Sequence, residues 1–227
     1  MTQGRQRHQF WRNNGLSLTL LAMFILLFAG QLLTGWTEHN HELMDHHAPA
    51  MALLDYARSG AFLEVTAENW ESEFLQMFVY VVFTVFLYQR GSSESKSPDE
   101  PAEVDEDPRL HSADPHAPWP VRRGGWVLKL YEHSLSLAFL AMFLVSFVLH
   151  ALAGHAARNA EQRLHGAAPE SLLRYLGSSR FWFESLQNWQ SEFLAIVSMV
   201  LLSVYLRQRG SPESKPVATP HAATGPD

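Results

Sequence analysis

The chain has no cysteine among its 227 residues. This absence excludes disulfide bonds, thiolate metal sites, thiol catalysis and the attachment of a c-type haem. Positive net charge is also lacking, since the formal net charge is −6 at pH 7, and nucleic-acid binding is therefore not expected. Because the sequence contains no Ser–His–Asp set, no nucleophile elbow and no nucleotide fingerprint, we expect a protein that is not an enzyme and holds no cofactor.

Charged residues are missing from two long stretches of the chain. Leu16–Thr37 carries no Asp, Glu, Lys or Arg over 22 residues, and His133–Ala157 carries none over 25. The apolar runs Phe74–Gln89 and Phe193–Leu206 are shorter, at 16 and 14 residues. About 20 helical residues cross the bilayer core of ~30 Å. We therefore predict an all-α membrane protein with four transmembrane helices, at residues 15–36, 70–89, 132–153 and 189–207.

The sequence repeats itself at an offset of 119 residues. The motif NWESEFL at 69–75 returns as NWQSEFL at 188–194, and QRGSSESK at 89–96 returns as QRGSPESK at 208–215. Ten of 20 positions also match between the first and third predicted spans. We therefore predict a tandem repeat of a two-helix unit, in which both units have the same orientation in the membrane.

Two polar segments set the predicted domain boundaries. Residues 92–121 contain eight acidic residues and almost no aliphatic ones, and residues 211–227 form a polar tail. Neither segment buries enough apolar surface to offset chain entropy, so we expect a disordered linker and a disordered tail. The two repeat units then occupy residues 1–91 and 122–210.

The distribution of Lys and Arg predicts the orientation. Eleven of the 17 precede the first span, lie between the second and third spans or follow the fourth. Because basic residues concentrate on the cytoplasmic side, both termini and the linker are predicted to be cytoplasmic. The first span follows a basic segment, as signal peptides do, but no A-x-A cleavage site comes after it, so we expect a retained anchor.

The two outer loops are predicted to be partly helical. The shared Leu-Leu-x-Tyr motif at 53–56 and 172–175 predicts a short amphipathic helix in each loop. After Ser59-Gly60 and Ser178-Ser179, a new helix is expected to begin and to continue into the second span of each unit.

Each NW-x-SEFL motif places a carboxylate at the edge of an apolar span. Glu73 and Glu192, with the adjacent Ser72 and Ser191, are candidates for an ion path, because ionisable groups inside a span are costly and mark function by default. If the repeat brings the two glutamates together, they would share a proton. The alternative is that both lie at headgroup depth and bind neighbouring hydroxyl groups.

The predicted outer loops also repeat a Glu-x3-His pattern. Glu42 and His46 match Glu161 and His165, and this spacing puts both side chains of a pair on one helix face. The two pairs could bind Zn²⁺ or another divalent metal. The alternative is a local Glu–His contact or a solvated loop.

Two further kinds of position could bind a ligand or a partner. His150 lies near the outer end of the third span, where the first span has Gln31. Haem ligation by such a histidine needs a facing partner in the core, and solvation at the helix end is the simpler interpretation. Arg90 and Arg209, after the second and fourth spans, are candidates for binding lipid headgroups or a membrane partner.

These motifs together resemble those of a known family. The chain contains NNGLSL, an outward TGW, ENWESEFLQM and, in both units, L-x-QRGS-x-ESK. This order is similar to that of an uncharacterised family of small bacterial integral membrane proteins, a domain of unknown function. The resemblance covers nearly all of both units and implies a bacterial inner membrane, but no activity. The second unit departs from the motif at Gln190 and Ala195, which replace Glu71 and Gln76.

The sequence favours two kinds of function. The first is an accessory or scaffold protein that works in the lipid bilayer with a membrane-protein partner or with a second copy of itself. The alternative is a small transporter or channel for a cation or proton, which uses Glu73 and Glu192 as paired intramembrane carboxylates.

Overall fold

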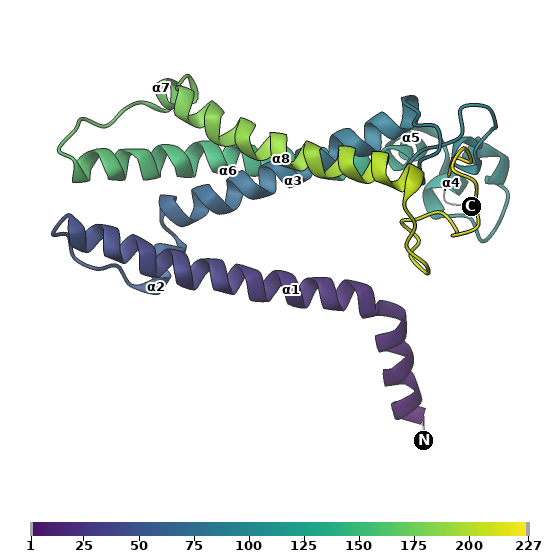
Figure 1. The fold of residues 1–227 in the computed structure, drawn as a ribbon, viewed down its shortest axis with the longest axis horizontal. Helices are drawn as coiled ribbons and strands as arrows, with labels where there is room; N and C mark the ends of the chain where they lie inside the picture. Colours follow the sequence, from purple (N-terminus) through teal and green to yellow (C-terminus); the bar gives the residue numbers. More distant parts are fainter. Residues whose placement is uncertain (1, 226–227) are drawn as a thin grey trace. The chain divides into compact units, whose positions relative to one another are not determined.

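The computed structural model describes residues 2–225, and this part of the chain is all-helical, as predicted (Figure 1). It contains no strand, and two 3-10 segments, η1 (Glu103–Asp105) and η2 (Pro108–His111), follow the third helix. The α-helices of the described part are α1 (Thr2–Asp45), α2 (Leu53–Ala57), α3 (Gly60–Phe86), α4 (Trp119–Arg123), α5 (Gly125–Glu132), α6 (Ser134–Leu164), α7 (Leu172–Leu176) and α8 (Ser179–Tyr205).

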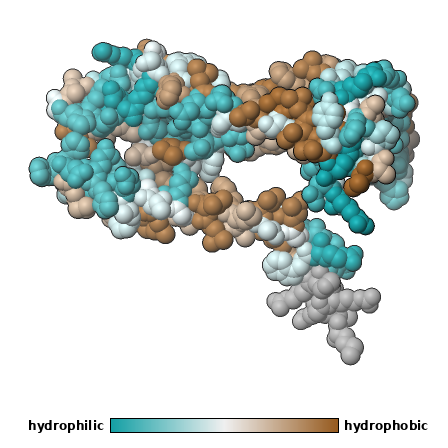
Figure 2. Space-filling view, viewed as in Figure 1, coloured by the Kyte–Doolittle hydropathy of each residue, from teal (hydrophilic) through white to brown (hydrophobic). Residues whose placement is uncertain are grey.

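Two of these helices are long and apolar enough to cross a membrane. They are α1 from Gln9 onward and α6 over its whole length, and they contain the predicted first and third spans. Apolar side chains of α1 such as Leu26 and Leu27 are 72% and 70% exposed. Figure 2 shows apolar residues over the middle of α1 and more hydrophilic residues towards its ends. The other two predicted spans lie mostly on α3 and α8, whose first halves contain several charged residues, and they stay predictions.

The chain divides into two compact units, whose bounds differ from those of the two predicted repeat units. The first consists of residues 2–65 and 152–170, and the second of residues 66–151 and 171–225. The first therefore contains α1, α2, the beginning of α3 and the end of α6, whereas the second contains the remaining helices and the segment between α3 and α4.

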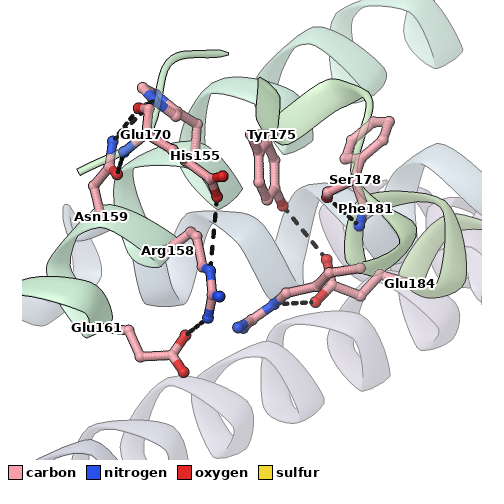
Figure 3. A network of polar contacts seen from close by, with 10 residues as sticks. His155, Arg158, Asn159, Glu161, Glu170, Tyr175, Ser178, Phe181 and Glu184 are labelled. Carbon is pink, nitrogen blue, oxygen red and sulfur yellow. Dashed lines mark hydrogen bonds and ion pairs between the residues drawn. The ribbon is translucent and has the colours of Figure 1, made fainter. Parts of the chain in front are cut away.

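In the first unit, one asparagine closes each of two loops. Asn40 on α1 accepts a hydrogen bond from the Met51 backbone N–H at 2.6 Å and donates to its carbonyl oxygen at 3.0 Å. Asn159 on α6 binds Glu170 in the same way, at 2.8 and 3.1 Å (Figure 3). The two asparagines occupy matching positions of the sequence repeat, so the loops after α1 and α6 close by the same local chemistry.

Gly60, at the start of α3, allows a close approach to α6 within the first unit. A Cβ atom at Gly60 would lie 2.6 Å from the Ala157 nitrogen and 2.7 Å from the Ala153 carbonyl oxygen. Because both contacts are to backbone, we expect Gly60→Ala to lower the free energy of unfolding by about 1–3 kcal/mol through overpacking. Gly30→Ala on α1 is the matched control, since nothing lies within 4 Å of the added carbon. Unfolding in detergent micelles measures the difference, and equal midpoints for the two variants would contradict this close packing.

The QRGS-x-ESK motif forms the same turn in both of its copies, each of which belongs to the second unit. Gly91 and Gly210 have φ angles of 85° and 87°, which glycine adopts without the cost that a Cβ atom would impose. In each copy, the backbone N–H of the glutamine donates to the hydroxyl of the serine six residues later, at 2.9 Å. The motif therefore marks the expected helix end, shortly after α3 and α8.

The tail after the second copy is arranged around a buried lysine. Lys215 is 1% exposed, and its Nζ donates to the carbonyl oxygens of Gly91, Ala223 and His221 at 2.5, 2.7 and 3.0 Å. Burial lowers the pKa of Lys215, and the neighbouring Arg207 lowers it further. These bonds connect the tail to the first copy of the motif.

The segment between α3 and α4 is held mainly by turns and exposed ion pairs. Lys96 Nζ lies 2.6 Å from Asp105, and Arg90 Nη2 lies 2.7 Å from Asp99. Ion pairs with solvent-exposed partners each contribute only about 0–1 kcal/mol. The contacts are therefore weak, and the disorder predicted for residues 92–121 stays a prediction, as do the proposed unit boundaries. For the predicted tail, residues 226–227 lie outside the described part of the chain.

Candidate functional site

A carboxylate and an imidazole form a buried pair inside the second unit. Glu71 on α3 and His150 on α6 are each 0% exposed, and His150 Nδ1 lies 2.7 Å from Glu71 Oε2. The helices that carry them are predominantly apolar. Burying a charge in such surroundings is costly unless a partner and hydrogen bonds compensate it. This pair is therefore the strongest candidate for a functional site in the described residues.

The second oxygen of Glu71 is also bound. The indole N–H of Trp189 on α8 donates to Glu71 Oε1 at 2.8 Å. The carboxylate of Glu71 thus receives one contact from α6 and one from α8, and its position is fixed from two sides.

The other ring nitrogen of His150 faces a second carboxylate. His150 Nε2 lies 4.0 Å from Glu184 Oε2 on α8. Glu184 also accepts a hydrogen bond from Arg180 Nε at 2.9 Å and a longer one from the Tyr175 hydroxyl at 3.4 Å (Figure 3). The imidazole therefore lies between two carboxylates, one at each ring nitrogen.

Aromatic side chains enclose the imidazole on this side. The rings of His150 and Phe181 have their centroids 4.9 Å apart, and Phe181 is 0% exposed. Phe181 in turn contacts the rings of Phe147 and Tyr175. Because these rings exclude water, the electrostatic interactions of His150 are stronger than they would be at the surface.

A third carboxylate lies one turn before Glu71 on α3. The side-chain amide of Asn188 donates to Glu68. Burial raises the pKa of Glu68, which precedes the predicted span at residues 70–89. The negative charges of Glu184 and Glu71 also raise the pKa of Glu68. His150 lowers this pKa, and the hydrogen bond from Asn188 lowers it by a smaller amount. The site therefore holds several titratable groups that influence one another.

Helical spacing explains how these side chains converge. Glu68 and Glu71 are three residues apart on α3, and Glu184 and Asn188 are four residues apart on α8. Residues at these spacings lie on the same face of a helix. One face of α3, one face of α8 and one imidazole from α6 therefore form the complete cluster. Because an imidazole changes its charge near neutral pH, such a cluster could bind a proton and exchange it.

The glutamates predicted from the repeated motif lie elsewhere. Glu73 is exposed on α3 and Glu192 is half-buried on α8. Ser72 and Ser191 both donate to the backbone carbonyl three residues earlier, at 2.8 and 3.0 Å. The buried carboxylate of the motif is thus Glu71, and the role of Glu73 and Glu192 in an ion path stays a prediction.

The residues predicted to bind a metal come together only in part, within the first unit. The rings of His46 and His165 are perpendicular, with centroids 4.8 Å apart. Glu42 lies near His39, at 3.8 Å, and Glu161 accepts from Arg158 at 3.1 Å (Figure 3). In residues 2–225, no group of three or more His, Asp or Glu side chains is placed to hold a metal ion.

The two arginines predicted to bind lipid headgroups or a partner are both exposed. Arg90 forms the ion pair with Asp99 described above. Arg209 lies beside Gly210 in the second copy of the turn. Both follow the end of a long helix, as expected, and their role in binding lipid or a partner stays a prediction.

The sequence did contain a signal for the buried pair. Glu71 is replaced by Gln190 at the matching position of the second repeat, and His150 is matched by Gln31 in the first. Both charged groups of the pair therefore have a glutamine as their repeat counterpart. The two positions at which one repeat has a charged group and the other a glutamine therefore point to the buried pair. The residues that both copies of the motif share point instead to Glu73.

One protein family matches residues 7–226 of the chain, and its description is "Domain of unknown function (DUF6766)". No curated protein and no solved structure is similar to the chain. The family is thus an uncharacterised one, as the resemblance implies. Its motifs, its bacterial origin and its membrane nature stay expectations, and the function is inferred from the site.

Proposed function

The chain belongs to this family of unknown function, and we propose that it is a non-enzymatic membrane protein that binds and transfers protons at the Glu71–His150 pair. The observation that carries the proposal is the complete burial of both side chains at a contact distance of 2.7 Å. In membrane helices, ionisable groups are rare and occur mainly in proton relays, ion paths and buried ion pairs.

The geometry of the imidazole supports proton transfer in particular. Glu71 lies at Nδ1 of His150 and Glu184 lies near Nε2. An imidazole placed in this way can accept a proton at one nitrogen and release a proton from the other, directly with Glu71 and through a bridging water with Glu184, which lies 4.0 Å away. Arg180, which binds Glu184, is 41% exposed at its side chain, so the relay reaches the solvent on the predicted outer side.

The proposal includes the topology predicted from the sequence. It comprises four spans, a tandem repeat of two-helix units, cytoplasmic termini and a bacterial inner membrane. Two features of the fold support the repeat: the matching asparagine contacts after α1 and α6, and the matching turns after α3 and α8. The apolar character of α1 and α6 supports insertion into the membrane.

Proton flux into proteoliposomes that contain the full chain tests the proposal. A potassium diffusion potential drives the flux, and an enclosed pH-sensitive dye reports it. Because a positioned acid or base contributes about 10²-fold or more to proton transfer, Glu71→Gln is expected to lower the flux by about that factor. Glu73→Gln is the matched control, since this exposed carboxylate lies only two residues away, and its flux is expected to stay near that of the unchanged chain.

Two outcomes would overturn the proposal in different ways. If vesicles with the unchanged chain are no more permeable to protons than empty vesicles, the chain does not conduct protons. If Glu73→Gln combined with Glu192→Gln abolishes the flux while Glu71→Gln does not, the path uses the repeated glutamates and not the buried pair.

A second candidate function is that of an accessory or scaffold protein. The exposure of Arg90 and Arg209 favours it, because a guanidinium at the end of a membrane helix can bind lipid phosphate or an acidic partner. The partner would be a membrane protein or a second copy of this chain. Absence of proton flux would favour this function, and crosslinking in native membranes would then identify the partner.

A further inference from the structure

If protons are bound at the Glu71–His150 pair, as proposed above, they need a route to the inner side. We infer that this route follows a stripe of polar side chains along α3 and ends at the Tyr80–Glu94 contact. The inference deepens the proposed function and rests on it, because it assigns the inner half of the path to particular residues of the second unit.

The stripe begins beside Glu71 and continues at every fourth position. Ser72, Gln76, Tyr80 and Thr84 follow one another at this spacing in a helix that is otherwise largely apolar. Residues four apart are neighbours on the surface of a helix. Ser72 is 1% exposed and Gln76 is 7% exposed, so the upper part of the stripe is buried.

Gln76 shows that this face of α3 is directed at α8. Its Nε2 donates to the backbone carbonyl oxygen of Glu192 at 2.9 Å. A buried amide beside a helix backbone offers both a donor and an acceptor. It can therefore hold a bridging water in place without carrying a charge itself, and the proton passes through the water.

The stripe ends at a carboxylate of the inner loop. The Tyr80 hydroxyl donates to Glu94 Oε2 at 2.8 Å, and Glu94 lies in the first copy of QRGS-x-ESK. The Ser93 hydroxyl donates to the other oxygen, Oε1, at 3.3 Å. A side chain within α3 is thereby connected directly to a carboxylate on the predicted cytoplasmic side.

A groove beside the inner part of the stripe, from Tyr80 onward, gives room for water. It has a volume of about 680 Å³, lies along α3 and α8, and includes Tyr80, Thr84, Glu94 and Gln190 among mostly apolar residues. Successive stripe residues rise by about 6 Å along the helix, a gap that one or two waters can bridge. A water occupies about 30 Å³ in the liquid, so the groove is large enough.

The matching stripe of the second repeat is interrupted. The positions that match Ser72, Gln76, Tyr80 and Thr84 are Ser191, Ala195, Met199 and Ser203 on α8. The side chains of Ala195 and Met199, in its middle, do not pass a proton. The inner half of the path is therefore assigned to α3 alone, and substitutions in α3 can interrupt it.

Tyr80→Phe tests the inference, because it removes one hydroxyl group and keeps the ring. We expect the proton flux into proteoliposomes to fall by about tenfold or more, as for the loss of a positioned proton-transfer group. Protonation at Glu71 should persist, and the pH-dependent fluorescence of Trp189, taken as the difference from Trp189→Phe, reports it in micelles. Tyr205→Phe on α8, where the tyrosine is 68% exposed, is the control and should keep its flux.

The outcomes separate this inference from the proposed function. Unchanged flux in Tyr80→Phe, together with lost flux in Glu71→Gln, would overturn the route along α3 and leave the proton-binding pair in place. Absence of flux in the unchanged chain would overturn both. If Tyr80→Phe does not reconstitute, Glu94→Gln alters the same contact from the loop side, and its flux is read in the same way.

Discussion

Replacing His150 alone with leucine is expected to lower the free energy of unfolding by about 3–5 kcal/mol, because it leaves the Glu71 carboxylate buried without its partner. Leucine fills a similar volume but offers no polar atom to Glu71 Oε2. The indole of Trp189 still binds Oε1, and a single neutral donor does not compensate a carboxylate that is 0% exposed. Unfolding by denaturant in micelles measures the loss.

The double variant Glu71→Leu with His150→Leu is the decisive comparison. It removes both polar groups, and replacing a buried ion pair with apolar side chains of similar size is often neutral or stabilising. We therefore expect the double variant to be more stable than His150→Leu alone, although the change would abolish proton binding at this site. A double variant as unstable as the sum of its single variants would show that the two side chains do not interact.

Glutamine at both positions gives a second comparison drawn from the chain itself. Gln190 and Gln31 occupy the positions that match Glu71 and His150 in the other repeat. If Glu71→Gln combined with His150→Gln folds stably and conducts no protons, the charged pair serves function and is not needed for folding. This outcome would explain why each repeat contributes only one charged member of the pair and has a glutamine at the other position.

Helical class and the starts of several helices could be predicted well, because they depend on local sequence. The predicted new helices after Ser59-Gly60 and Ser178-Ser179 are confirmed, with α3 beginning at Gly60 and α8 at Ser179. The short helices predicted at the Leu-Leu-x-Tyr motifs are confirmed as α2 and α7. Serine at the N-cap explains such starts, since the Ser178 hydroxyl accepts from the Phe181 N–H.

Helix length was harder to predict, because it was derived from apolar runs alone. The first span was predicted at 15–36, yet α1 continues to Asp45. No helix breaker occurs before Ala48-Pro49, and a residue that precedes proline disfavours helical geometry. α6 similarly continues to Leu164, shortly before Gly166. Polar residues extend a helix as readily as apolar ones when nothing interrupts it.

The buried pair could not be predicted from the repeated motif, because burial depends on which face of α3 meets its neighbours. Glu71 and Glu73 are two residues apart, and this spacing places them about 200° apart around the helix. One of the two must therefore lie on the opposite face from the other, and hydropathy does not reveal which. The contacts of Glu71 with α6 and α8 are tertiary contacts between helices far apart in sequence.

Replacing Phe181 with alanine is the second large effect that we expect. Phe181 is 0% exposed and contacts the rings of His150, Tyr175 and Phe147. Truncating a buried phenylalanine to alanine costs about 3–5 kcal/mol through lost contacts and a residual cavity. Here the cavity would also open next to the imidazole, so that water could reach His150 and weaken its interaction with Glu71. Thermal unfolding in micelles measures the loss of stability.

Phe183→Ala is the matched control on the same helix, because Phe183 is 67% exposed and its truncation removes few contacts. We expect this variant to unfold close to the unchanged chain and to conduct protons at a similar rate. The ring of Phe181, in contrast, both packs the core and keeps the imidazole dry, so Phe181→Ala should lose stability and alter the pH dependence of proton flux together. A variant that loses stability but keeps the pH dependence unchanged would show that the ring only packs the core, and that the water-excluded setting of His150 is not part of the proton-binding site.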